Sequence, residues 1–230
     1  MYKKLGILGG MGPLATYTLY RNIIETTPAK SDQEHIDMII LNASYIPDRT
    51  AGILNRGKSP LPELLGALKN LETCGCDLIA VPCNTSHYYY DELQESCKAK
   101  ILNMPDLTAE VLENAGIKKV YLMATEGTIK TEVYQKFFDL RGIDILAPHD
   151  EEIAEMMRVI YDIKAGRAPS LDKLEEIARQ YGLPVVLGCT EFATVQFKYI
   201  KYIDSMQVLQ DKILELFGVK TVDFFDNIVI

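Results

Sequence analysis

The chain has 230 residues, of which 48% are hydrophobic and 24% charged, a composition typical of a soluble globular protein with one large domain or two small ones. Its formal net charge of −8 argues against nucleic acids and anionic membranes as partners, because both are bound by basic surfaces. Five cysteines are too few for a disulfide scaffold and predict a cytoplasmic protein, and no apolar stretch approaches the roughly 20 residues that span a bilayer.

The first half of the chain alternates short apolar runs with helical patterns. Strands are predicted at 4–8, 37–41, 77–82 and 100–103. Helices are predicted at 15–24, 62–73, 88–97 and 107–115, and the segment 42–56 is predicted to be a loop. Pro13 suits the first turn of a helix and Gly75 suits the position just after one, so both mark helix boundaries.

The second half repeats this order. Strands are predicted at 119–123, 143–146, 184–188 and 202–204, and helices at 151–164, 173–181, 206–217 and in a segment ending at Phe138. Continuous apolar strands separated by helices are typical of parallel sheets buried on both faces. The sequence therefore predicts an α/β fold of two pseudo-symmetric lobes, each a parallel sheet flanked by helices, with the active site in the cleft between them. We expect residues 1–104 and 206–230 to form the first lobe and 105–205 the second, with the last helix crossing back to cover the first.

Cys83 and Cys189 both lie where a buried strand ends and polar residues begin. Ligands of open α/β sheets bind at the carboxyl ends of the strands, so these two thiols are candidates for a pair that flanks one substrate. A helix that begins directly after each cysteine would lower the pKa of its thiol. The alternative is that they are inert buried side chains, which is our interpretation of Cys74, Cys76 and Cys97.

Two other motifs suggest ligands that we do not favour. Cys76, Cys83 and His87 are of zinc-ligand types, but the strand between the two cysteines separates them by roughly 20 Å, so no metal site is predicted. The run GMGPLA at 10–15 fits the dinucleotide-binding fingerprint, but Asn42 stands where that fingerprint has an acidic residue. We interpret residues 10–12 as a loop whose backbone N–H groups approach a small anion.

Arg49, Lys164 and His87 are further candidates for the cleft. The two cations suit an anionic substrate, although each is also explained as a solvated surface charge. His87 lies four residues after Cys83, so one helical turn could bring it to the thiol, or it caps or packs locally.

Six short motifs lie in order along nearly the whole chain. They are GGMGPLAT at 9–16, IPDRT at 46–50, PCNTSH at 82–87, ATEGT at 124–128, IKAG at 163–166 and GCTE at 188–191. Together they resemble the aspartate/glutamate racemase family, specifically its aspartate racemase branch. The resemblance implies an enzyme that racemises amino acids without pyridoxal phosphate or another cofactor, uses two cysteines on pseudo-symmetric lobes, and commonly forms a homodimer.

The resemblance also implies roles for individual residues. Cys83 and Cys189 match the acid/base pair, and Arg49 and Lys164 match positions that hold substrate carboxylates. The other substrate-binding residues that it implies are Met11, Gly12, Asn84, Thr85, Ser86 and Thr190. This chain departs from the family pattern at Ser86, where alanine is common, and at residues 192–194, where Phe-Ala-Thr replaces a leucine-proline segment and alters a wall that selects the substrate side chain.

The predicted function is the interconversion of L- and D-aspartate by proton transfer at the α-carbon between two cysteines. The alternatives are a glutamate or broad-range racemase, a hydantoin racemase, a dicarboxylate cis–trans isomerase, a non-catalytic amino-acid-binding protein, and a pyridoxal enzyme with Lys164 as its Schiff base. The predicted partners are a small acidic amino acid and a second copy of the chain, without nucleic acid or membrane.

Overall fold

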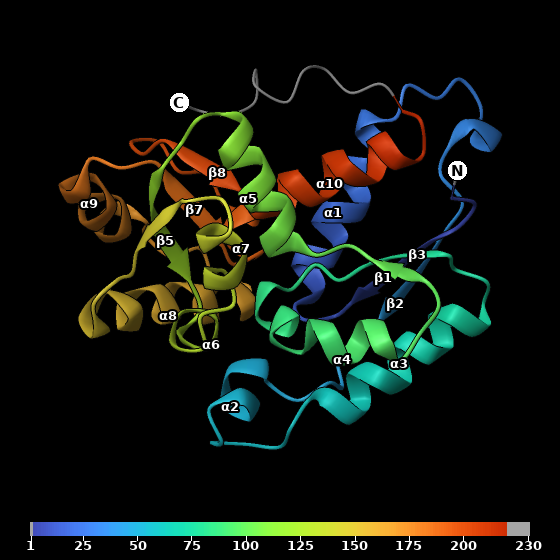
Figure 1. Cartoon of the computed structure of the whole chain (residues 1–230), viewed down its shortest axis with the longest axis horizontal. Helices are drawn as coiled ribbons and strands as arrows, with labels where there is room; N and C mark the ends of the chain where they lie inside the picture. The colour runs from blue at the N-terminus through green and yellow to red at the C-terminus, as the bar shows by residue number, and fades with distance from the viewer. Residues whose placement is uncertain (1, 220–230) are drawn as a thin grey trace.

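A computed structural model describes residues 2–219, which form two four-stranded parallel sheets flanked by helices (Figure 1). The first sheet contains β1 (Leu5–Gly9), β2 (Met38–Asn42), β3 (Leu78–Ala80) and β4 (Lys100–Ile101). The second contains β5 (Lys119–Ala124), β6 (Asp144–Leu146), β7 (Val185–Gly188) and β8 (Tyr202–Asp204). Both sheets have the same strand order, β2-β1-β3-β4 and β6-β5-β7-β8, so the predicted α/β fold with two similar lobes is confirmed.

The helices follow the predicted order, with local differences. The α-helices are α1 (Pro13–Thr26), α2 (Arg49–Ile53), α3 (Leu61–Thr73), α4 (Tyr90–Glu95), α5 (Met104–Asn114), α6 (Glu126–Lys130), α7 (Gln135–Asp139), α8 (Asp150–Lys164), α9 (Asp172–Tyr181) and α10 (Ser205–Leu216). Three short 3₁₀ helices are η1 (Asp32–Glu34), η2 (Asn84–Tyr89) and η3 (Phe192–Thr194).

Two of these differences correct the sequence analysis. The predicted loop 42–56 contains α2, which begins because Asp48 caps it: Asp48 Oδ1 accepts a hydrogen bond from the Ala51 N–H at 2.8 Å. The predicted single helix ending at Phe138 is split into α6 and α7, because Glu132 adopts a left-handed conformation with φ of 54° that interrupts it.

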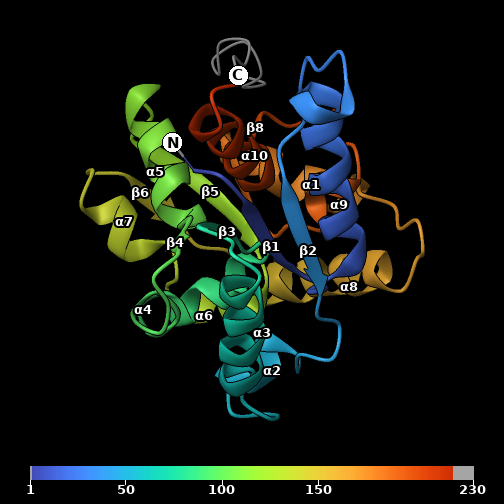
Figure 2. The ribbon, with the colours of Figure 1, turned by 90° about the vertical axis from the view of Figure 1, so that its right-hand side faces the viewer.

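The last helix, α10, contacts both lobes. Leu209 packs in the same apolar cluster as Leu5 of β1, whereas Val208 packs in a cluster with Val120 of β5. In both views α10 lies beside α5 and α1 (Figures 1 and 2). The predicted division of the chain into lobes stays a prediction, and the part of it after residue 219 lies outside the described residues.

None of the helices in the described part of the chain combines the length and the apolar character that crossing a bilayer requires.

Candidate active site

Cys83 and Cys189 lie at equivalent places in the two lobes. Each follows the third strand in its sheet order, β3 for Cys83 and β7 for Cys189. Both cysteines line one small cavity between the lobes, and the two residues are 5% and 4% exposed. The residues that line this cavity are Met11, Asp48, Arg49, Thr50, Cys83, Asn84, Thr85, Thr125, Lys164, Cys189, Thr190 and Glu191. The strand ends thus bring together two cysteines that are far apart in the sequence.

Gly12 and Ser86 are the two predicted site residues that do not line the cavity. Gly12 lies next to Glu191, since a Cβ at this position would lie 3.1 Å from Glu191 Oε1. Ser86 is fully buried, and its hydroxyl donates a hydrogen bond to Met11 Sδ at 3.5 Å. Gly12 and Ser86 therefore each contact a residue that lines the cavity.

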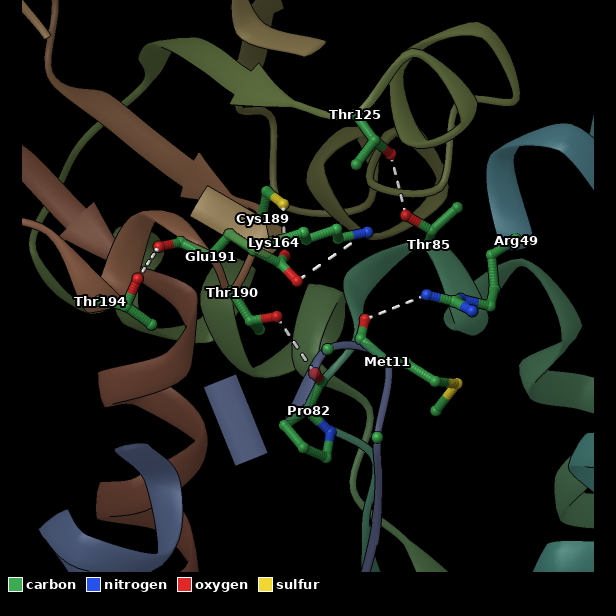
Figure 3. Close-up of polar contacts among 12 residues, drawn as sticks. Met11, Arg49, Pro82, Thr85, Thr125, Lys164, Cys189, Thr190, Glu191 and Thr194 are labelled. Atoms are coloured by element: carbon green, nitrogen blue, oxygen red, sulfur yellow. Dashed lines mark hydrogen bonds and ion pairs between the residues drawn. The ribbon is translucent and has the colours of Figure 1, made fainter. Parts of the chain in front are cut away.

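Glu191 links Cys189 to Lys164 on the second lobe (Figure 3). The Cys189 thiol donates a hydrogen bond to Glu191 Oε2 at 3.0 Å, and Lys164 Nζ lies 3.9 Å from Glu191 Oε1. Glu191 is 3% exposed, and its Oε1 accepts no hydrogen bond within the described residues. A buried carboxylate oxygen left unbound is costly, so this oxygen suits a cationic or hydrogen-bonding group of a ligand.

The environment of Cys189 favours its thiol form. Burial, followed by the negative charge of Glu191, raises the pKa of Cys189 well above its usual range, and Lys164 offsets this only in part. From the sequence, a helix start was expected to lower this pKa. That expectation is wrong for Cys189, because burial and the Glu191 carboxylate raise the pKa and only a turn and the three-residue η3 follow the cysteine.

Replacing Glu191 by glutamine is therefore expected to lower the pKa of Cys189. The neutral amide removes the repulsion of the thiolate and leaves Lys164 unopposed, so alkylation of Cys189 by iodoacetamide should reach its midpoint at a lower pH. Peptide mass spectrometry across pH 6–10 would measure the extent of Cys189 alkylation at each pH. Glu110→Gln, an exposed substitution with the same charge change, is the control, and equal profiles for the two variants would contradict the role of Glu191.

Lys164 is one of the two cations that line the cavity, the other being Arg49, and its surroundings keep it in the charged form. Burial lowers its pKa, but the Glu191 carboxylate and the two cysteines outweigh that effect, and the net shift is upward. Its ammonium also lies 5.7 Å from the centre of the Tyr161 ring. Lys164 thus presents a stable positive charge to the cavity.

Arg49 is buried, and no carboxylate of residues 2–219 pairs with it. Its guanidinium, 8% exposed, donates from Nη1 to the carbonyls of Ile46 and Pro47 at 3.2 and 3.0 Å, and from Nη2 to the Met11 carbonyl at 3.2 Å (Figure 3). Nε has no partner within residues 2–219. The Nε–H and the second Nη2 hydrogen remain for a ligand, and together they form an edge that can grip a carboxylate. A buried cation held only by neutral carbonyls favours an anionic ligand.

Hydroxyl groups connect the two lobes across the cavity. Thr190 Oγ1 of the second lobe donates to the Pro82 carbonyl of the first at 3.1 Å. The hydroxyl of Thr85 lies 2.8 Å from that of Thr125 and 3.0 Å from that of Thr128, which are themselves 2.9 Å apart. These bonds fix the relative position of the two walls.

Asn84 takes part in a separate chain of hydrogen bonds. Its Oδ1 accepts from the Tyr134 hydroxyl at 2.6 Å, and its Nδ2 donates to Ser205 Oγ at 2.9 Å. Ser205 in turn donates to the Leu187 carbonyl at 2.7 Å, so Asn84 is anchored to the second lobe and to α10.

His87 binds the backbone and not the thiol. Its Nδ1 lies 3.0 Å from the Cys83 carbonyl, and its Nε2 accepts from the Met104 N–H at 3.2 Å. Burial lowers the pKa of this imidazole. Of the two alternatives from the sequence, the structure supports local packing: the ring joins the end of β3 to the start of α5.

Four residues that line the cavity were not predicted as site residues from the sequence, namely Glu191, Thr125, Asp48 and Thr50. All four lie inside motifs that were quoted for the family resemblance. Their position in the GCTE, ATEGT and IPDRT motifs was the signal that could have identified them. Within the described residues, no three His, Cys, Asp or Glu side chains come together as a metal site would require.

Comparisons with known proteins identify the family of the chain. The family model "Asp/Glu/Hydantoin racemase" matches residues 8–212. The chain is 30% identical over 148 residues to the broad-specificity amino-acid racemase RacX of Bacillus subtilis, a match that covers 62% of this chain and 63% of that protein.

Solved structures extend the likeness to the whole fold. An aspartate racemase from Picrophilus torridus matches with a TM-score of 0.87 and 28% identity, covering 99% of this chain and 100% of that one. An aspartate racemase homologue from Pyrococcus horikoshii matches with a TM-score of 0.74 and 27% identity, covering 94% and 99%. The chain belongs to the Asp/Glu/hydantoin racemase family, and the predicted class of enzyme, an isomerase of the racemase type, is confirmed.

Proposed function

We propose that the protein interconverts L- and D-aspartate without pyridoxal phosphate, with Cys83 and Cys189 exchanging the α-proton from opposite sides. The observation that carries the proposal is that both thiols line one cavity from different lobes. Racemisation removes a proton from one face of the α-carbon and returns one to the other. A thiol on each side allows this without any large movement of the substrate.

The cations of the cavity support an acidic amino acid as substrate. We assign Arg49 to the distal carboxylate because its free edge can form two parallel hydrogen bonds. Lys164, with the backbone near Met11 and Gly12, serves the α-carboxylate, and Glu191 Oε1 serves the α-ammonium. The aspartate racemase from Picrophilus torridus, 28% identical over the whole chain, supports aspartate over glutamate.

The protonation of Cys189 defines the first direction of transfer. Cys189 rests as a thiol because of burial and Glu191. Cys83 in its thiolate form takes the α-proton, and Cys189 delivers its proton to the opposite face of the resulting carbanion. The reverse direction starts from the state that this transfer leaves, with Cys83 as the thiol and Cys189 as the thiolate, so the two cysteines exchange the roles of acid and base.

Stabilising the carbanion is the difficult step. A turnover of about 10 per second corresponds to a barrier of roughly 16 kcal/mol, which a free amino-acid carbanion exceeds. Fixed charges in a small buried cavity lower this barrier because they need no reorganisation during the reaction. Lys164 and Arg49 supply those charges, and the hydroxyl bonds between the lobes keep them in place.

The charge on Lys164 argues against a Schiff-base role. A lysine that attacks an aldehyde must be a neutral amine, whereas the surroundings of Lys164 raise its pKa.

A broad-range amino-acid racemase is the second candidate. Its support is the 30% identity to RacX, named a broad-specificity racemase, over 63% of that protein's length. The two proposals differ in the need for a distal carboxylate, since only a broad-range enzyme accepts alanine or lysine as well as aspartate.

A substrate panel tests the proposal. Purified protein, passed through a desalting column without added pyridoxal phosphate, is incubated with single enantiomers of aspartate, glutamate, asparagine, alanine and lysine, and the products are resolved by chiral chromatography. We expect aspartate to racemise at the highest rate. Comparable rates for alanine and lysine would support the broad-range candidate, and no turnover of any amino acid would contradict both.

A further inference from the structure

The cavity is closed by the segment that begins at Arg49. In both views α2 lies next to α6 of the second lobe (Figures 1 and 2). The contact is tight: a Cβ added at Gly127 would lie 2.9 Å from Thr50 Oγ1 and 3.1 Å from Thr50 Cα. Because the thiols of Cys83 and Cys189 are at most 5% exposed, an amino acid reaches them only when these walls separate.

Local hydrogen bonds hold residues 49–56 together, and Arg56 lies at the end of this segment. After α2 the chain turns through Asn55, which has a φ of 58°, and the Arg56 N–H donates to the Ala51 carbonyl at 2.7 Å. Ala51 is also bound by the cap from Asp48. Arg56 is therefore tied to the same short helix that carries Arg49.

The side chain of Arg56 binds the second lobe. Its Nη1 and Nη2 donate to the two carboxylate oxygens of Glu126 at 2.7 and 3.0 Å. Glu126 is the first residue of α6 and directly follows Thr125 of the cavity wall. Lys130, one turn later in α6, holds the same carboxylate at 3.1 Å. A planar guanidinium paired at two points fixes direction as well as distance.

We infer that Arg56 and Glu126 form a latch that keeps α2, and with it Arg49, closed over the cavity. Both are positioning residues, since they lie outside the lining and act through α2 and α6. The inference rests on the proposed function for the identity of the molecule that enters, but the closure itself does not depend on that function.

Alkylation of the cavity cysteines by iodoacetamide measures the latch without using racemase activity. Arg56→Gln and Glu126→Gln are each expected to raise the labelling rate of Cys83 about two- to fivefold, the effect of losing one exposed ion pair. The charge-reversed double variant, Arg56→Glu with Glu126→Arg, should return the rate toward the wild-type value. Lys130→Gln is the matched control, because it removes an ion pair to Glu126 that does not cross between the lobes.

Raising the salt to 1 M should speed labelling of Cys83 in the wild type but not in Arg56→Gln, because salt screens the ion pair that this variant already lacks.

Cys76 serves as an internal standard for unfolding. It is buried in the core of the first lobe, away from the cavity. Labelling of Cys83 that rises while Cys76 stays protected supports the latch. The inference is overturned if Cys83 labelling is unchanged in both single variants, if Cys76 is labelled in step with Cys83, or if Lys130→Gln has the same effect. Racemisation assays on the same proteins report separately on the proposed function.

Discussion

Replacing Cys83 or Cys189 by alanine is expected to reduce the racemisation of aspartate by about 10²- to 10⁴-fold, the usual contribution of a general acid or base. Either substitution alone suffices, because each direction of the reaction needs one thiolate and one thiol. The change removes a single sulfur atom from the edge of an apolar core, so the fold is expected to persist, as circular dichroism would verify. Cys97→Ala is the matched control, since Cys97 lies outside the cavity.

Deuterium exchange separates the roles of the two cysteines. In deuterated water the wild-type enzyme should place deuterium mainly in the product enantiomer, because the donor thiol has exchanged with solvent and the removed proton stays on the other sulfur. Cys189→Ala should retain slow α-proton exchange for only one enantiomer, the one whose α-proton faces Cys83, and Cys83→Ala for the other. Proton NMR of each enantiomer gives both rates. Racemisation at the wild-type rate in either variant would contradict the two-base scheme.

The pairing of the two cysteines could be predicted because each of them follows a continuous apolar run and precedes polar residues. The runs before Cys83 and Cys189 are apolar without alternation, and the structure buries β3 and β7 completely. Parallel strands bring their carboxyl ends to one edge of the sheet, so a polar residue after such a run is placed by topology alone. No detail of side-chain packing was needed for this step.

The electrostatics of the site could not be predicted in the same way. The effect of Glu191 on Cys189 depends on a 3.0 Å contact and on deep burial. The sequence shows only that the two residues are two positions apart, which reveals neither the contact nor the burial. Lys164, the partner of Glu191, is the last residue of α8, and the contact exists only after α8 packs against the second sheet. Burial and the Glu191 carboxylate raise the pKa of Cys189, opposite to the lowering expected from a helix start.

Local structure between the sheets was also hard to predict. The start of α2 depends on one cap from Asp48, and the break between α6 and α7 depends on the left-handed conformation of Glu132. Such single-residue signals are weak beside hydrophobic periodicity. They matter here because α2 carries Arg49 and α6 carries Glu126.

Arg49→Gln is expected to lower kcat/KM for aspartate about 10- to 100-fold, while leaving the smaller rate with asparagine less affected. The physical reason is the loss of a charge-assisted pair with the distal carboxylate, which is worth about 1.5–3 kcal/mol. Asparagine has nearly the same shape but no distal charge, so the ratio of the two kcat/KM values isolates this contact from general damage. Chiral chromatography of both amino acids gives the ratio.

Two further variants make this result specific to the guanidinium. Arg49→Lys keeps the charge but loses the planar fork and the bonds to the carbonyls of Ile46, Pro47 and Met11, so we expect only partial recovery of the aspartate rate. Arg21→Gln, an exposed cation on α1, should change neither rate. An equal loss for aspartate and asparagine in Arg49→Gln would assign Arg49 to the α-carboxylate or to the architecture of the loop, because only a contact to the distal group distinguishes these two substrates.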